Sequence, residues 1–366
     1  MTYRVIVWAP GGVGSVALAE VITHPDLELA GVFSYTRPGA DAGQLVGLPA
    51  TGVITTDDPE VIFSMPADVV LFFASKAYGM EANDATIVRL LEAEKNVITT
   101  TSYVHLPTYD GSMCDRVASA CERGETTFFG TGENPGVMLE RVLTTLTGIC
   151  HRVDQIKLQE YVDVRSSPSP RMVFDVMSMG KPPADVSMER PMVRTVSKMY
   201  EQAVAGAAAV MDIELDRIEP SLEVAVLDED ITVAAGRISK GTVAAQRLTW
   251  TGYCDDKPLI VDQQIWYATR DIPGWNLDVL EGHRRNFWRG TVNGLPSIEL
   301  HLDVWMPGHD QPGLQNARPT QLLTAMTAVR AIGEVCAAPP GILYAPVFAP
   351  FRPHHRLTVQ ETSSRT

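Results

Sequence analysis

The sequence predicts an α/β protein: a Rossmann domain with a doubly wound parallel sheet, plus an α+β second domain with a mixed or antiparallel sheet. Three observations predict this. A glycine-rich turn joins a β-branched run to a helical pattern within residues 3–19. Strand and helix patterns then alternate up to about residue 130. From about residue 152, alternating strands and one long helical pattern take over.

The glycine turn is the most informative stretch of the sequence. Val5–Val7 is typical of a buried strand, and the pattern Ala9-x-Gly11-x-x-Gly14 follows it directly. In a dinucleotide-binding turn, one glycine lets the backbone approach a pyrophosphate and another lets the helix pack on the strand, while the helix N-terminus attracts the phosphates. The alternative is an ordinary strand–helix turn whose glycines serve geometry alone. The cofactor contacts expected here are Ala9, Pro10, Gly11, Gly12, Val13 and Gly14.

The second predicted strand, Leu27–Phe33, ends without a carboxylate. An acidic residue at that place would bind the ribose 2′-hydroxyl of NAD. The chain has Ser34, Thr36 and Arg37 instead. Hydroxyls and a guanidinium suit a 2′-phosphate, because guanidinium binds phosphate through two parallel hydrogen bonds. We therefore expect NADP as the preferred cofactor, with NAD possible; the alternative for Arg37 is a solvated loop residue.

Further strands are predicted at 67–73, 96–100 and 126–129, with helices at 80–93 and 113–123. Ligands bind outside the carboxyl ends of the strands in such a sheet. The loops that follow these strands should therefore surround the cofactor. Asn134 would contact the cofactor carboxamide or fix its own loop. The cofactor contacts expected in these loops are Ala74, Ser75, Thr101 and Asn134.

The remainder of the chain has a different pattern. Its longest helix is predicted at 191–212, and its last helix at 320–336 is expected to return to the first domain. The predicted strands lie at 156–162, 222–227, 241–253 and 260–268, followed by a hairpin with its turn near Asn293-Gly294. The expected domains are a Rossmann domain (1–140), a substrate and dimerisation domain (141–318), the returning helix (319–345) and a loosely ordered tail (346–366).

The composition of the chain excludes several classes of protein. The chain has 366 residues, of which 45% are hydrophobic and 20% charged, which is enough for two domains with sizeable cores. Its net charge of −14 argues against nucleic-acid and anionic membrane partners, and no apolar run is long enough to span a bilayer. The five cysteines include no Cys-x-x-Cys pair, which predicts no metal site, no disulfide framework and a reducing cytoplasm. A strand that begins at Tyr3 predicts no signal peptide.

Several motifs resemble one family. They are the opening Val-Ile-Val-Trp-Ala-Pro-Gly-Gly-Val-Gly and the segments at 47–53, 95–100, 130–136 and 336–341. Together they resemble the 2,4-diaminopentanoate dehydrogenase and native amine dehydrogenase family, whose N-terminal domain is similar to that of dihydrodipicolinate reductase. The resemblance extends to about residue 345. It implies a Rossmann domain, a second domain that shapes the substrate pocket, a homodimer, NADP or NAD, and hydride transfer at a carbon bearing nitrogen.

The chain departs from the family pattern in two places. Amine dehydrogenases of this kind usually have a glutamate just after the strand that corresponds to Asn96–Thr100, whereas Thr101–His105 contains no carboxylate. Dihydrodipicolinate reductases have a His-His-x-x-x-Lys signature in the second domain. It is absent here, since the one His-His pair is His354-His355.

Three residues are candidates for moving the proton that accompanies hydride transfer. Tyr103 and His105 lie in the loop where the family has its catalytic acid, and either could donate a proton; His105 could instead cap a backbone carbonyl. Glu133, within the glycine-rich loop 130–136, could replace the missing glutamate or cap the following helix.

The function expected from these observations is NAD(P)-dependent oxidoreduction at a carbonyl, imine or amine carbon of a small, largely apolar substrate. The alternatives are a non-catalytic dinucleotide-binding protein and a biosynthetic imine reductase of the dihydrodipicolinate reductase type.

Overall fold

The computed structural model describes residues 2–75, 80–272, 274–275, 277 and 286–353. The chain forms two compact units. The first unit contains the residues up to Val137 and the segment Val304–Ala345. The second unit contains Met138–Asp303 and the chain from Pro346 onward. The expected tail beyond Pro353 lies outside the described residues.

The first unit is built on a six-stranded parallel sheet in the order β14-β5-β4-β3-β1-β2. The chain passes from β1 to β2 on one side and then returns to β3 on the other, so the connections change direction at β1. Ligands bind at such a switch point in open parallel sheets. The strands are β1 (Tyr3–Trp8), β2 (Leu27–Phe33), β3 (Val69–Phe72), β4 (Asn96–Thr99), β5 (Thr127–Gly130) and β14 (Gly341–Leu343).

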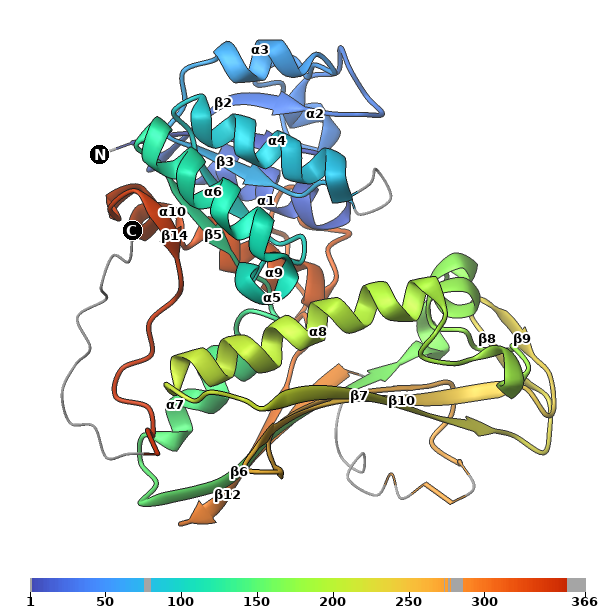
Figure 1. Cartoon of the computed structure of the whole chain (residues 1–366). Helices are drawn as coiled ribbons and strands as arrows, with labels where there is room; N and C mark the ends of the chain where they lie inside the picture. Colours follow the sequence, from blue (N-terminus) through green and yellow to red (C-terminus); the bar gives the residue numbers. More distant parts are fainter. Residues whose placement is uncertain (1, 76–79, 273, 276, 278–285, 354–366) are drawn as a thin grey trace. The chain divides into compact units, whose positions relative to one another are not determined.

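Helices cover both faces of this sheet (Figure 1). One buried core joins the sheet to α1, α9 and α10, and a second core joins it to α3, α4 and α6. The predicted doubly wound sheet is therefore confirmed. The helices of the unit are α1 (Gly12–Thr23), α2 (Ala42–Leu45), α3 (Pro59–Ser64), α4 (Met80–Glu92), α5 (Leu106–Tyr109), α6 (Gly111–Gly124), α9 (Pro319–Val329) and α10 (Ile332–Ala337).

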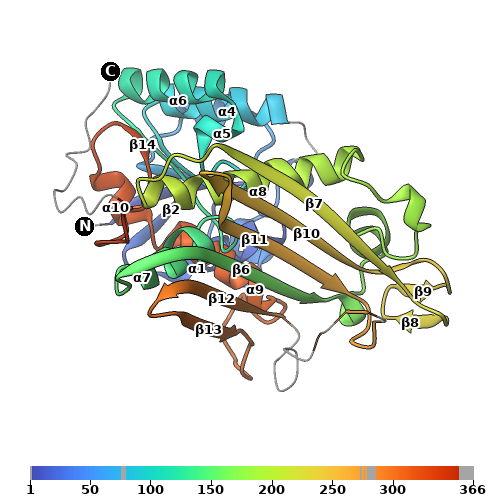
Figure 2. The same cartoon turned by 60° about the horizontal axis from the view of Figure 1, so that its bottom comes forward.

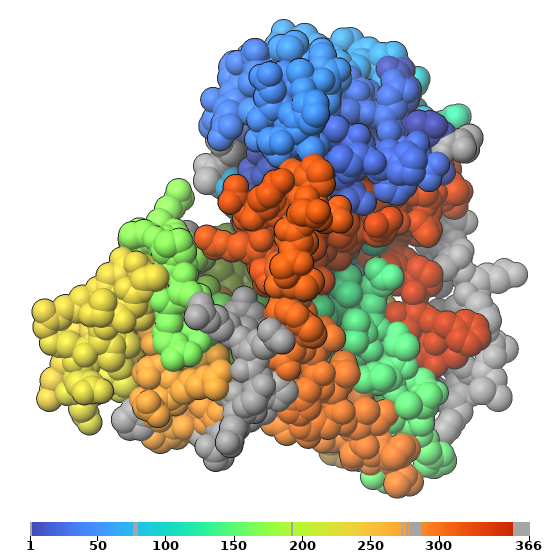
Figure 3. Space-filling view, turned by 180° about the vertical axis from the view of Figure 1, so that it is seen from behind, coloured from blue at the N-terminus to red at the C-terminus, as the bar shows by residue number. Residues whose placement is uncertain are grey.

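The segment Val304–Ala345 packs against the N-terminal residues, which it adjoins in orange-red and blue in Figure 3. The prediction of a single helix at 320–336 is wrong, because the helix is interrupted at Arg330-Ala331 and forms α9 and α10. The break lets α9 pack along α1 while α10 contacts β4 and β5. After Pro339-Pro340, β14 adds a sixth strand beside β5.

The second unit contains a six-stranded mixed sheet in the order β13-β12-β6-β11-β10-β7 (Figure 2). Strands β6 and β11 are parallel, and the other neighbours are antiparallel. Strands β8 and β9 form a separate pair. The strands are β6 (Arg152–Asp163), β7 (Arg217–Val226), β8 (Ile231–Val233), β9 (Gly236–Ile238), β10 (Val243–Cys254), β11 (Lys257–Tyr267), β12 (Asn286–Leu295) and β13 (Ile298–Asp303).

The prediction of a hairpin turn near Asn293-Gly294 is wrong. Both residues lie inside β12, where the pairing with β6 shifts register, and the connection to β13 falls at Pro296-Ser297. A glycine inside a strand often marks a bulge of this kind.

Helix α8 (Pro191–Val210) contacts β7, β10 and β11 on one face of this sheet. It is anchored by Trp250, which stacks on Tyr200 and donates its indole N–H to Ser197 at 2.8 Å. The other helical segments of the unit are η2 (Met138–Leu143), α7 (Thr144–Thr147), η3 (Val164–Ser166), η4 (Arg171–Val176) and η5 (Pro183–Asp185). Within the described residues, none of the helices is both long and apolar enough to cross a bilayer.

Candidate active site

The glycine turn between β1 and α1 is tightly folded. Ala9 has a positive φ of 62°, and Gly11 N–H donates to the Ala9 carbonyl at 2.7 Å. A Cβ placed on Gly14 would lie 2.7 Å from the Ala9 carbonyl oxygen and 3.0 Å from the Phe73 ring. Only glycine at position 14 therefore lets α1 pack this closely on β1 and the loop after β3.

The same turn is open on its other side. Gly11 and Gly12 are exposed, and nothing lies within 4 Å of a Cβ placed on Gly11. The first turn of α1 carries no acidic residue, and its N–H groups have no partners within the helix. Pro10 and Val13 are half-buried beside them. The residues present thus fit the phosphates of a dinucleotide, because they offer a backbone donor set and positive potential with room for an anion.

Of the three cofactor contacts expected in the loop after β2, one is buried and two are exposed. Ser34 is buried, and its hydroxyl oxygen accepts from the Arg37 N–H at 3.3 Å. The Thr55 hydroxyl donates to the Arg37 carbonyl. Thr36 and Arg37 are exposed, and no carboxylate in the described part of the chain pairs with the Arg37 guanidinium. Ser34 therefore shapes the loop that presents Thr36 and Arg37.

The loops after β3 and β4 are bonded to each other. The Thr101 hydroxyl donates to the Ala74 carbonyl at 3.0 Å, and Asn83 of α4 donates to the Ser75 carbonyl at 3.4 Å. Ala74 and Thr101 are buried, whereas Ser75 is exposed. Of these three expected cofactor contacts, Ser75 is accessible to a ligand, whereas Ala74 and Thr101 hold the loops in place.

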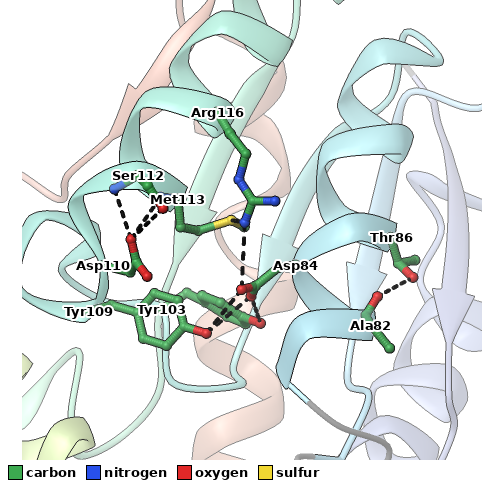
Figure 4. A network of polar contacts seen from close by, with 9 residues as sticks. All are labelled: Ala82, Asp84, Thr86, Tyr103, Tyr109, Asp110, Ser112, Met113 and Arg116. Atoms are coloured by element: carbon green, nitrogen blue, oxygen red, sulfur yellow. Dashed lines mark hydrogen bonds and ion pairs between the residues drawn. The ribbon is translucent and has the colours of Figure 1, made fainter.

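Tyr103 lies in a buried network around Asp84 (Figure 4). Its hydroxyl donates to the Asp84 carboxylate at 2.6 Å, and the Tyr109 hydroxyl donates to the same group at 3.2 Å. The Arg116 guanidinium lies 3.7 Å away. Burial, reinforced by Asp84, raises the pKa of Tyr103 far above its usual value. Because its proton is committed to Asp84, this placement favours a role in positioning the β4 loop.

His105 is the N-cap residue of the short helix α5 and is half-buried. Its Nδ1 lies 2.9 Å from the Thr108 hydroxyl, and its ring packs near Tyr344. Burial lowers the pKa of His105, which keeps the imidazole neutral at pH 7. A neutral, locally bonded histidine holds its own loop and is a poor proton donor.

Glu133 follows β5 and is half-buried. Its carboxylate accepts a hydrogen bond from the Thr324 hydroxyl of α9. The expected helix directly after Pro135 does not form, since the next helical segment begins at Met138. Asn134 beside it is buried. The Glu133 carboxylate is therefore held by the C-terminal segment, at the carboxyl edge of the sheet where the β1, β3 and β4 loops also lie.

Sequence reasoning missed the partners of these residues. Asp84 and Thr324 each serve a candidate residue, but Thr324 is separated from Glu133 by 191 positions along the chain. The sequence feature that could indicate Thr324 is its place as a polar residue on a helix that is expected to return to the first domain.

The comparisons with known proteins agree with this geometry. Residues 3–105 match the family model of the dihydrodipicolinate reductase N-terminus. Over 359 residues the chain is 27% identical to an amine dehydrogenase from Streptomyces virginiae, which covers 95% of this chain and 96% of the relative. The chain is thus similar to an amine dehydrogenase along almost its whole length, and it is an NAD(P)-dependent oxidoreductase. The resemblance expected from the sequence is thus confirmed, and so is the use of a nicotinamide dinucleotide in general.

Solved structures show the same fold. An amine dehydrogenase from Mycobacterium smegmatis superposes with a TM-score of 0.70 at 18% identity, covering 94% of this chain and 95% of the other. A myo-inositol 2-dehydrogenase from Lactobacillus plantarum has a TM-score of 0.55 at 9% identity, with coverages of 94% and 92%.

Proposed function

We propose that this oxidoreductase transfers a hydride between NADP, preferred over NAD, and a carbon that bears nitrogen or oxygen in a small, largely apolar substrate. The observation that carries the proposal is the open glycine turn at Gly11–Gly14, which lies at the switch point of a parallel sheet. The similarity to an amine dehydrogenase along almost the whole chain supports the nitrogen-bearing carbon.

Named residues would hold the cofactor. The backbone N–H groups of Gly12 and Val13 suit the pyrophosphate, and the exposed Thr36 and Arg37 suit a 2′-phosphate. When bound, the dinucleotide supplies or accepts the hydride at its nicotinamide ring. The protein contributes orientation and a proton path.

Glu133 is the group to which we assign the proton. An amine that gives up a hydride from carbon becomes an iminium, which must then lose a proton from nitrogen to become an imine. In this proposal the Glu133 carboxylate takes that proton, and it returns it in the reductive direction. Thr324 orients the carboxylate, while Tyr103 and His105 hold the neighbouring loop.

The test compares wild type with Glu133→Gln, using amines with NADP and ketones or imines with NADPH and ammonia. Glu133→Gln is expected to lower turnover on the order of 100-fold, because general acid–base catalysis contributes about that much. Its dinucleotide Kd should stay within about twofold of wild type. Glu94→Gln, at an exposed position, serves as the matched control.

The other outcomes separate the alternatives. Unchanged turnover in Glu133→Gln would remove Glu133 from the mechanism. Dinucleotide binding without turnover by wild type on any substrate of the panel would favour a non-catalytic binding protein.

The proposal also includes assembly and location. The family resemblance supports a homodimer, which sedimentation of the purified chain measures directly. Five cysteines without a disulfide among the described residues suit a cytoplasmic enzyme.

A further inference from the structure

Helices α1 and α9 lie side by side and run in the same direction. Gln321 near the start of α9 is beside Gly12 at the start of α1. Near their other ends, the Arg330 guanidinium lies 3.4 Å from the Glu20 carboxylate. Both contacts fall within the first unit. The beginning of α9 therefore lies next to the turn that we assign to the cofactor phosphates.

The Gln321 amide is held in one orientation. Its Oε1 accepts from the Arg318 N–H at 3.1 Å, which fixes the oxygen at the start of α9. Its Nε2 faces the glycine turn, because a Cβ placed on Gly12 would lie only 2.8 Å from that atom. Among the described residues, no group accepts a hydrogen bond from Nε2. A half-buried amide donor thus lies against an exposed turn in which the N–H groups of Gly12 and Val13 have no acceptor within the helix.

We propose that Gln321 is a cofactor-binding residue whose Nε2 donates a hydrogen bond to the phosphates of the dinucleotide. The proposal rests on the proposed function, since it assumes that the turn binds a dinucleotide. A pyrophosphate supplies the oxygen acceptors that the amide and the adjacent N–H groups share. A Cβ at position 12 would displace the end of the Gln321 side chain.

The face of α9 that carries Gln321 also contacts Glu133, the proposed proton carrier. Thr324 lies three residues after Gln321, so the two side chains share one face of α9. Gln321 lies against the phosphate turn, and Thr324 donates to Glu133. Helix α9 therefore joins the two functional parts of the first unit, and its contact with the cofactor bears on the position of Glu133.

Calorimetric titration of the full chain with NADP and with NAD tests the proposal. Gln321→Leu removes the donor, and Gln321→Glu replaces it with a carboxylate facing the phosphates. We expect Kd to rise about tenfold in Gln321→Leu and more in Gln321→Glu. The factor should be equal for NADP and NAD, because both contain the pyrophosphate. A change confined to NADP would instead assign the effect to the 2′-phosphate and overturn the proposal.

The matched control is Arg330→Gln at the far end of the same helix pair, which should bind both dinucleotides as wild type does. Thermal melting without ligand shows whether each variant is folded. Wild-type affinity in both Gln321 variants would overturn the proposal and leave the proposed function intact. Failure of wild type to bind either dinucleotide would overturn the proposed function itself.

Discussion

His105 gives the β4 loop a pH-dependent stability. Burial lowers the pKa of its imidazole in the folded protein, whereas the unfolded chain titrates near the ordinary value of about 6.5. As pH falls through that value, the unfolded state takes up a proton that the folded state does not, so the free energy of unfolding decreases. The stability contributed by the neutral histidine is fully present above about pH 7.

The variant His105→Gln removes this titration while keeping a group that can bond Thr108. We expect urea unfolding to show that wild type loses more stability than His105→Gln between about pH 7 and 5. Identical pH dependence in the two proteins would mean that the imidazole is protonated equally in both states.

Candidate residues that lie in a local motif could be predicted from the sequence. The glycine turn and Arg37 both follow predicted strands, so their places at the sheet edge follow from the strand pattern alone. Gln321 and Thr324 could not be predicted in this way. Their proposed roles depend on α9 packing along α1, which no local pattern encodes.

At the scale of elements, the Asp84 network joins α4, α5 and α6 to the loop that follows β4 (Figure 4). Tyr103 is almost fully buried and makes the shorter of the two tyrosine bonds, whereas Tyr109 is half-buried with a bond of 3.2 Å. Removing the first hydroxyl leaves a buried carboxylate with one donor fewer.

We expect Tyr103→Phe to lower the free energy of unfolding by about 1–2 kcal/mol, and Tyr109→Phe by less. Urea unfolding of both variants measures the difference. A Tyr103→Phe protein with wild-type stability but no turnover would show instead that Tyr103 supplies the catalytic proton.

The strongly patterned elements were predictable from the sequence, and the context-dependent ones were not. Helices α4, α6 and α8 lie where their apolar spacing places them. The three residues of β14 are too few to show a period, and they become a strand because β5 offers a free edge. The break before α10 and the bulge at Asn293-Gly294 likewise follow from tertiary packing and pairing.

At the scale of the whole molecule, the first unit is discontinuous in sequence. The expected returning helix at 319–345 is part of a longer segment, Val304–Ala345, that completes the parallel sheet with β14 and supplies α9. The order of the elements along the chain cannot reveal this discontinuity, because β13 and the segment that follows it belong to different units. The first unit thus obtains a strand and a helix, with Gln321 and Thr324, from a part of the chain about 170 residues beyond its main body.

Charge at this scale also bears on the cofactor. The chain has a net charge of −14, so its overall field does not attract a phosphorylated dinucleotide. In the proposed function, affinity comes from local groups, which are the N–H groups of the α1 turn and the guanidinium of Arg37.

Calorimetric titration of wild type and Arg37→Gln with NADP and NAD tests this account most directly. We expect wild type to bind NADP more tightly than NAD. Arg37→Gln should weaken NADP binding about tenfold and leave NAD binding almost unchanged, because only NADP has the 2′-phosphate. Equal loss for both dinucleotides would contradict the role of Arg37, and no binding of either by wild type would contradict the central claim that the Gly11–Gly14 turn is a cofactor site.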